Sequence, residues 1–421
     1  MKNKRQLSVF ENLIWNTVGS FTYLLCQWLL TLIVVRESGD MGNAGDLALA
    51  ISITNIFFNV ACFNVRPYLI SDLKNHFSSR EYSTFRILSC SGAIILCGIY
   101  VGGFHYSQRQ MMCIMLYMIY KVGEAWVDLL HGFEQRRSRM DIGGISLFCR
   151  GILSVITFYL TLKTTQDINW SVALMAIVTL LFIFIYDMPQ AMCFEDLLPS
   201  FNRHNIILML VEFLPLTVGA FLSSTGANLP RQVLEAQMGN ESLGIYSTVA
   251  TPAVIVQVAA SYIFNPVLTE FAKYYNRSEI RKFTILVLKI TMCIVVLAVS
   301  SVIGGKLLGR WGLELLYGNK IAKYVDLLIP VIIYTCLNAY VWFFWNLLII
   351  MRKLKTLLLI NGMGVILCII SMRKIISMYG MNGVSYVLIG YSIVLTCMMF
   401  VVLARDLVNK SRNKETKSSN L

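Results

Sequence analysis

Twelve apolar stretches, each about 20 residues long, constrain the fold of this chain more than any other feature. A helix of that length crosses the hydrocarbon core of a bilayer, because its backbone N–H and C=O groups pair within the helix. The sequence therefore predicts an all-α polytopic membrane protein with about twelve transmembrane helices. We place the spans near residues 12–35, 44–65, 85–104, 111–131, 143–163, 168–187, 206–226, 243–264, 284–303, 324–350, 355–372 and 381–404.

The composition agrees with this class. Hydrophobic residues make up 57% of the 421 residues, charged residues make up 14%, and the mean hydropathy is +0.65. A soluble domain has about 25% charged residues. The net charge of +13 is typical of basic cytoplasmic loops that face anionic lipid, so we expect membrane lipid and no nucleic acid as a partner. The cysteines form no CxxC pair, so neither a disulfide framework nor a zinc site is predicted.

The lysine and arginine residues of the connecting segments predict the orientation. With the N-terminus inside, 23 of them fall in cytoplasmic segments, beginning with Lys2, Lys4 and Arg5, and 10 fall in outer segments. By the positive-inside rule, both termini are predicted to be cytoplasmic. No cleavable signal peptide is predicted, since residues 1–5 lead directly into the first span. The polar tail, 409–421, is predicted to be disordered.

The chain also contains an internal repeat at an offset of about 200 residues. Residues 217–221, TVGAF, repeat residues 17–21, TVGSF, and Gly239-Asn240 repeats Gly42-Asn43. The loop after the second span, from Arg66, resembles the loop from Asn265 in the same order. The sequence predicts two six-helix lobes, 1–200 and 201–408, related by an axis along the membrane normal, with a substrate site where the lobes meet.

Four polar side chains of the fourth span fall on one stripe of a helix. They are Lys121, Glu124, Asp128 and His131, spaced by three or four residues. Such a stripe does not face lipid, because an ionised group in hydrocarbon is costly. Two interpretations stay open: the stripe lines a wet cavity, or it fastens this helix to a neighbour.

Further candidates lie in the fifth and seventh spans. Arg150 and Glu212 stand six or seven residues inside their spans, roughly 10 Å deep at 1.5 Å per residue. Pro215 follows Glu212 by one turn and removes a backbone hydrogen bond, so we expect the seventh span to bend there and to act in gating.

Soluble-enzyme motifs are absent from the sequence. Residues 300–306 do not form a P-loop, because Ser300 stands where the leading glycine belongs. Neither HExxH nor GxSxG occurs. We therefore expect no metal and no cofactor, and a transport process driven by a gradient, by the membrane potential or by substrate supply.

Two connections carry a family resemblance. Asp128-Leu-Leu-His-Gly132, followed by Arg139-Met-Asp141-Ile-Gly143, is similar to the connection between the fourth and fifth spans of the Wzx-type polysaccharide flippases. Asn228-Leu-Pro-Arg231 with Leu243-Gly244-Ile245-Tyr246 is similar to their connection between the seventh and eighth spans. These flippases belong to the multidrug/oligosaccharidyl-lipid/polysaccharide exporter superfamily, and the resemblance implies a MATE-like fold of two lobes.

The resemblance also implies a function and a location. Members of the family carry oligosaccharide units on undecaprenyl pyrophosphate across the bacterial cytoplasmic (inner) membrane for O-antigen or capsule synthesis. This reaction makes no covalent change, so a transporter and not an enzyme is expected. A polysaccharide polymerase and chain-length proteins are the partners that it implies.

By that analogy the charged residues inside the predicted spans have roles in substrate binding and coupling. Lys121 and Arg150 are suited to bind the pyrophosphate, since arginine offers two parallel donors and lysine a point charge. Glu124, Asp128 and Glu212 would pair with these cations in the empty state, or bind a coupling H⁺ or Na⁺. The alternatives are an ion-coupled multidrug antiporter of the same fold class and a polysaccharide polymerase, which usually has one large outer loop.

Overall fold

The computed structural model describes residues 8–38, 40–72 and 76–419, and nearly all of them are helical, with no strand in these ranges. Lys2, Lys4 and Arg5, on which the predicted orientation partly depends, lie outside the described residues. The chain divides into two compact units, Met1–Ser224 and Thr225–Leu421 (unit 1 and unit 2). The division falls inside helix α9, whereas the sequence places the lobe boundary at residue 200.

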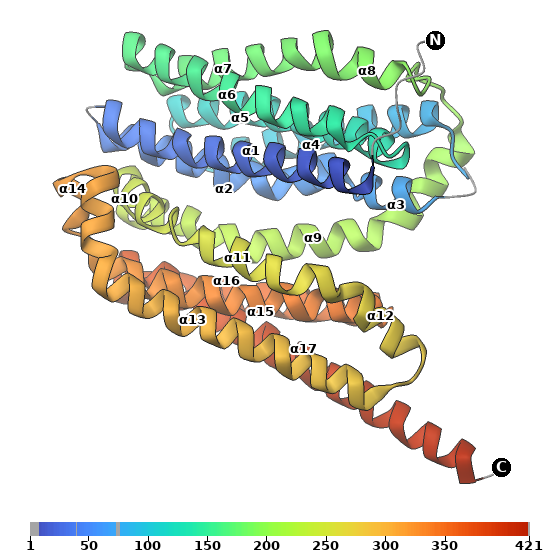
Figure 1. The fold of residues 1–421 in the computed structure, drawn as a ribbon. Coiled ribbons are helices and arrows are strands. Elements are labelled where there is room, and N and C mark those ends of the chain that lie inside the picture. Colours follow the sequence, from blue (N-terminus) through green and yellow to red (C-terminus); the bar gives the residue numbers. More distant parts are fainter. Residues whose placement is uncertain (1–7, 39, 73–75, 420–421) are drawn as a thin grey trace. The chain divides into compact units, whose positions relative to one another are not determined.

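Unit 1 is a bundle in which α5 lies against α2, α3, α4 and α7, and α1 packs along α6 (Figure 1). Its helices are α1 Val9–Glu37, α2 Met41–Cys62, α3 Val65–Ser71, α4 Ser79–Gly103, α5 Gln108–Arg136, α6 Met140–Thr165, α7 Ile168–Phe182, the π-helix η1 Ile183–Asp187, α8 Met188–Met192 and the first part of α9, Arg203–Met238.

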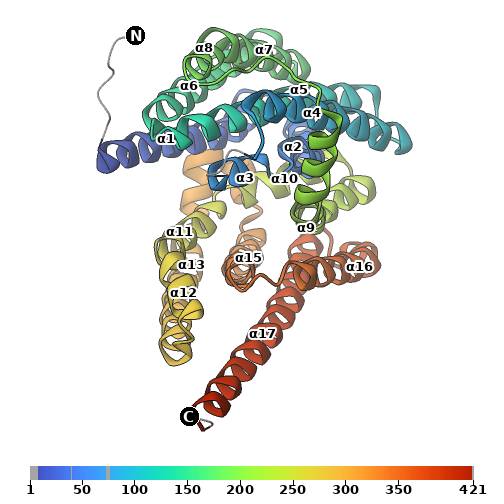
Figure 2. The ribbon, with the colours of Figure 1, turned by 90° about the vertical axis from the view of Figure 1, so that its right-hand side faces the viewer.

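In unit 2, α15 lies against α11, α13 and α17, and α16 packs along α17 (Figure 2). Its elements after α9 are α10 Asn240–Ala250, α11 Val254–Phe264, the 3₁₀ turn η2 Asn265–Val267, α12 Leu268–Asn276, α13 Ile280–Tyr317, α14 Asn319–Ala322, the 3₁₀ turn η3 Val325–Leu327, α15 Leu328–Ile350, α16 Leu354–Tyr379 and α17 Met381–Ser419.

The predicted fold class is confirmed. Eleven helical stretches of the described chain are long and apolar enough to cross a membrane. The predicted fourth span, α5, is not among them because its polar stripe lowers its hydropathy, but its 29 residues rise about 44 Å at 1.5 Å per residue. With α5 the spans number twelve, as the sequence predicts.

Helix α17 continues into the predicted tail. No glycine or proline follows Gly390, so no residue breaks the helix before Ser419. The disorder predicted for 409–421 stays a prediction for a stretch that the structure draws largely as helix.

Serine side chains define the starts of three helices in unit 1. Ser8, Ser78 and Ser107 each accept a hydrogen bond from the backbone N–H three residues later, where Glu11, Glu81 and Gln110 return a bond to the serine N–H. Such a capping box satisfies amides that the first turn leaves without a partner. The starts of α1, α4 and α5 are therefore encoded locally.

Two glycines bring α1 and α6 into backbone contact. A Cβ built on Gly19 would lie 2.2 Å from the Gly144 carbonyl oxygen, and one built on Gly144 would lie 2.3 Å from the Trp15 carbonyl oxygen. No side chain larger than hydrogen fits at either position. The close approach sets the crossing of these two helices beside the charged residues of unit 1.

Two prolines of the described chain differ in their effect on helix continuity. Helix α9 continues through Pro215, and the predicted gating role of this residue stays a prediction. The region predicted as the eighth span, 243–264, instead contains α10 and α11, separated by the turn Thr251-Pro252-Ala253, and the stretch long and apolar enough to cross a membrane begins only at Val254. Pro252 lacks the N–H that would continue α10, which explains the break.

The connection between α8 and α9 is attached to the start of α4 and the end of α5. Arg80 Nε donates to Asp196 Oδ2 at 2.7 Å, and Ser200 N donates to Thr84 Oγ1 at 2.8 Å. Glu195 accepts from Arg137 Nη2 at 3.0 Å. These bonds order the connection, 193–202, on unit 1.

Candidate functional site

Arg150 of α6 is the central cation of unit 1. Its side chain is 1% exposed and forms an ion pair with Glu124 of α5. Its Nε donates to Ser146 Oγ at 3.1 Å and lies 3.8 Å from Asp187 Oδ2. A buried arginine requires such partners, because an unpaired charge in the membrane interior is costly.

Aromatic side chains complete the surroundings of this arginine. The guanidinium lies 5.5 Å from the ring centroid of Tyr23 on α1. Tyr23 and Tyr120 share a hydrogen bond of 2.7 Å between their hydroxyls, and Gln27 Nε2 donates to the Tyr120 hydroxyl at 2.8 Å. Helices α1, α5 and α6 thus jointly position the cation.

Lys121, the second predicted cation, is half-buried and binds aromatic faces. Its Nζ lies 5.0 Å from the ring centroid of Phe58 and 5.7 Å from that of Tyr117, at cation–π distances. It forms no ion pair with any residue that the structure describes. The pairing of Lys121 with Glu124 that the helical spacing suggested is absent, since Glu124 pairs with Arg150.

Asp128 joins two further arginines, Arg66 from the predicted loop after the second span and Arg86 from the start of the predicted third span. Its oxygens lie 3.4 Å from Arg66 Nη1 of α3 and 3.3 Å from Arg86 Nη2 of α4. Arg86 is fully buried and also donates from Nη1 to the Ala61 carbonyl oxygen at 2.6 Å. The stripe on α5 therefore fastens this helix to its neighbours, which was one of the two interpretations left open.

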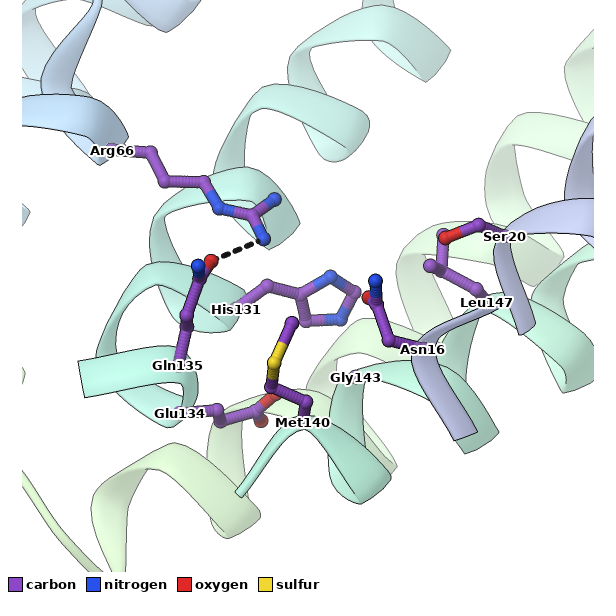
Figure 3. A pocket seen from close by; sticks show the side chains of 9 residues that line it. All are labelled: Asn16, Ser20, Arg66, His131, Glu134, Gln135, Met140, Gly143 and Leu147. Atoms are coloured by element: carbon purple, nitrogen blue, oxygen red, sulfur yellow. Dashed lines mark hydrogen bonds between the residues drawn. The ribbon is translucent and has the colours of Figure 1, made fainter. Parts of the chain in front are cut away.

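One residue of the stripe, His131, also borders a cavity, whereas Lys121, Glu124 and Asp128 do not line it. A pocket of about 180 Å³ lies in unit 1 between α1, α3, α5 and α6 (Figure 3). Its polar lining consists of Asn16 and Ser20 from α1, Arg66 from α3, and His131, Glu134 and Gln135 from α5. Arg66 Nη2 donates to Gln135 Oε1 at 2.9 Å across it.

Glu212 and Arg150, expected to pair when the lobes approach, have other partners. Glu212 on α9 is exposed and accepts a hydrogen bond from the Tyr68 hydroxyl at 2.5 Å. Arg150 forms an ion pair with Glu124. Of the predicted site residues, the structure brings Arg150 together with Glu124 and leaves Glu212 apart from both.

Asp187, which the sequence analysis did not single out, contacts both the arginine and the pocket. It is fully buried at the end of the π-helix η1, and its Oδ1 lies 3.9 Å from His131 Nε2. A π turn inside an α-helix often marks a functional position. The signal in the sequence was its place inside the predicted sixth span, where an ionisable residue is by default a candidate.

Two cations of unit 1 keep capacity for a further partner. Arg150 Nη2 has no hydrogen-bond partner among the described residues, so the guanidinium retains a donor besides those used by Glu124 and Ser146. The Lys121 ammonium has no carboxylate partner in the same set. Two cations with unused capacity, on adjacent helices of unit 1, suit a phosphate group.

Comparisons with known proteins identify the fold. The lipid II flippase MurJ, in an inward closed conformation, matches with a TM-score of 0.73 at 14% identity, over 95% of this chain and 90% of MurJ. An inward-facing multidrug resistance MATE family transporter of the MOP superfamily matches with a TM-score of 0.68 at 10% identity, over 96% of this chain and 99% of that one. This chain has the fold of these transporters. The abbreviation MOP denotes the exporter superfamily named above.

The sequence comparison narrows the resemblance. The capsular polysaccharide biosynthesis protein CapF of Staphylococcus aureus is 26% identical over 314 residues, which cover 74% of this chain and 78% of CapF. No protein-family model matches the chain. Together with this fold, the similarity to CapF confirms the resemblance to the polysaccharide flippases.

Proposed function

We propose that this chain is a flippase for surface polysaccharide synthesis. It moves an oligosaccharide unit linked to undecaprenyl pyrophosphate across the bacterial cytoplasmic membrane, for O-antigen or capsule. The similarity to CapF, a capsule biosynthesis protein, and to MurJ, a lipid II flippase, supports this substrate class. A polysaccharide polymerase and chain-length proteins are the partners that such a step requires.

The observation that carries the proposal is the buried Arg150. A multidrug antiporter of the same fold would offer cationic drugs a carboxylate, but here the carboxylate of Glu124 is neutralised by an arginine. An incoming pyrophosphate instead replaces Glu124 as the partner of the guanidinium, and Lys121 adds a second cation on α5. Because Arg150 exchanges one counter-charge for another, its guanidinium is not left unpaired in a medium of low dielectric constant.

Complementation of a bacterial strain that lacks its polysaccharide flippase tests the proposal. The wild-type chain restores surface polysaccharide, and Arg150→Ala abolishes it while the protein stays in the membrane. Arg150→Lys restores only part, because lysine keeps the charge and loses the two parallel donors. Lys121→Ala reduces the product as well.

The matched control is Lys282→Ala, an exposed lysine paired with Glu279 three residues away, which retains full activity. Full activity of both Arg150→Ala and Lys121→Ala would overturn the proposed site. Loss of the protein from the membrane would show instead that these residues are structural.

A further inference from the structure

Three buried titratable side chains of unit 1 have no part in binding phosphate. Glu134 is 1% exposed, His131 7% and Asp187 0%. Glu134 and His131 lie one turn apart on α5, and both approach Gly143 of α6. A Cβ built on Gly143 would lie 3.2 Å from Glu134 Oε2 and 3.2 Å from the His131 ring. Glycine at this position leaves room for both side chains in the pocket.

Glu134 is the member of this group with the fewest interactions. Neither of its carboxylate oxygens accepts a hydrogen bond from any described residue, although the side chain lines the pocket (Figure 3). Burying an ionised carboxylate without hydrogen bonds costs several kcal/mol. Binding a proton removes the charge and turns one oxygen into a donor.

The charges around Glu134 favour that proton. The groups that face it from other elements are Arg66 of α3, Arg139 and Asp141 of α6, and Tyr186 and Asp187 of η1. Both arginines already hold a carboxylate: Arg66 lies 3.4 Å from Asp128, and Arg139 makes two hydrogen bonds of 2.8 Å to Asp141. What remains near Glu134 is a second acid, Asp187, whose negative charge disfavours a second anion.

A metal ion fits this group less well than a proton. No three His, Cys, Asp or Glu side chains converge as metal ligands anywhere in the described chain. Sodium requires several oxygen ligands at once, whereas a proton requires one.

The group is also connected to Arg150. Asp187 presents one carboxylate oxygen to His131 Nε2 at 3.9 Å and the other to Arg150 Nε at 3.8 Å. When Asp187 is ionised it helps to hold the guanidinium in place. When Asp187 carries a proton, Glu124 is the one carboxylate of the described residues still paired with Arg150, and an anion displaces it more easily.

We propose that Glu134, His131 and Asp187 form a proton-binding site that is linked to phosphate binding at Arg150. The link rests on the proposed function, and the proton site itself does not. By thermodynamic reciprocity, a proton bound here strengthens phosphate binding, and bound phosphate strengthens proton binding. The site therefore couples the flippase step to protons and not to sodium.

Infrared difference spectroscopy of the purified full chain in lipid nanodiscs tests the proton site. We expect the wild-type protein to show the C=O band of a buried protonated carboxyl at neutral pH, and Glu134→Gln to lack it. The matched control is Glu81→Gln. Glu81 is equally a buried glutamate, but it accepts hydrogen bonds from Ser78 N at 2.8 Å and Asn205 Nδ2 at 2.6 Å, so it is ionised and its replacement leaves the band unchanged.

Binding of inorganic pyrophosphate to the same samples tests the link. Relative to Asp187→Asn, the wild-type affinity should fall as the pH rises, by at most about tenfold per pH unit for one linked proton. The Asp187→Asn variant removes the titrating carboxyl group and keeps the shape of the side chain. Pyrophosphate also changes its own protonation with pH, but this change affects both proteins equally and cancels when they are compared.

Each result decides a separate claim. A wild-type spectrum without the carboxyl band overturns the proton site, whether or not the variants fold, and so does a band that neither Glu134→Gln nor Asp187→Asn alters. Equal pH dependence in wild type and Asp187→Asn overturns the link. A band that Glu134→Gln removes, in a protein that neither binds pyrophosphate nor complements the flippase-deficient strain, leaves the proton site standing and refutes the proposed function.

Discussion

Arg86 and Arg150 show what a buried cation requires inside a membrane helix. Each is almost wholly buried, and each contacts a carboxylate on α5, Asp128 and Glu124 respectively. The sequence predicted Arg150 as a site residue from its depth in the fifth span. It did not single out Arg86, which stands at the beginning of the predicted third span. Hydropathy locates a charge along the chain, but it does not reveal which helix supplies the partner.

The surroundings of Glu195 indicate how the connection between α8 and α9, 193–202, responds to acid. Burial alone would raise the pKa of Glu195, but the hydrogen bond from Ser79 and the guanidinium groups of Arg136 and Arg137 hold that pKa below its usual value. A group whose pKa is lowered by folding stabilises the protein above its unfolded pKa, about 4.3 for glutamate, and this stabilisation is lost as the pH falls through the folded pKa.

The Glu195→Gln variant should therefore be less stable than wild type at neutral pH, by about 2 kcal/mol for hydrogen bonds to a charged group. The difference should shrink in acid. Thermal unfolding of both proteins in detergent, at a series of pH values, measures it. Glu212→Gln, which alters an exposed carboxylate, serves as the control with a smaller effect. A difference that stays constant from neutral pH into acid would contradict the assignment.

At the scale of elements, the contact of α1 with α6 depends on two glycines. Gly144→Ala places a methyl group against the Trp15 carbonyl at 2.3 Å, so the helices must separate. We expect a loss of about 1–3 kcal/mol, the usual cost of overpacking, together with reduced transport, because α1 and α6 carry Tyr23 and Arg150.

The control for this substitution is Gly92→Ala in α4, where a Cβ meets nothing within 4 Å. Alanine there should be neutral or stabilising by up to about 1 kcal/mol, its advantage over glycine in a helix. Thermal stability and complementation of the two variants are compared side by side. Equal behaviour would show that the α1–α6 contact adapts to a methyl group.

The elements themselves could largely be predicted from the sequence, and their irregularities could not. Eleven of the twelve spans lie near their predicted positions, α5 included, although its hydropathy alone would not identify it, and the eighth, predicted at 243–264, corresponds to the apolar stretch Val254–Asn276. The sequence alone does not distinguish Pro215, which lies within the continuous helix α9, from Pro252, which follows the end of α10. A proline is tolerated in a helix or breaks it according to the packing around it. The π-helix η1 has no sequence signature of this kind, so the position of Asp187 beside Arg150 could not be foreseen.

At the scale of the whole molecule, the orientation in the membrane stays a prediction, and Cys193 offers a test. It is exposed in the connection after α8, which we place in the cytoplasm. The other exposed cysteines, Cys293 and Cys397, are replaced with serine. An impermeant maleimide should then label Cys193 in inverted vesicles and not in intact cells.

Lys163→Cys, at the exposed outer end of α6, should show the opposite pattern and serves as the control. Labelling of Cys193 in intact cells would reverse the orientation derived from the lysine and arginine distribution.

The polar stripe of α5 has a consequence for how the chain enters the membrane during synthesis. An Asp, Lys or Arg at the centre of a span opposes insertion by about 2.5–3.5 kcal/mol each, and α5 carries several ionisable residues. Arg66 and Arg86 precede it in the chain and are available for Asp128 when α5 emerges from the ribosome. Arg150, the partner of Glu124, is made later. We therefore expect α5 to stay next to α3 and α4 until α6 has been synthesised and supplies Arg150. The helices of unit 1 would then assemble together rather than one at a time.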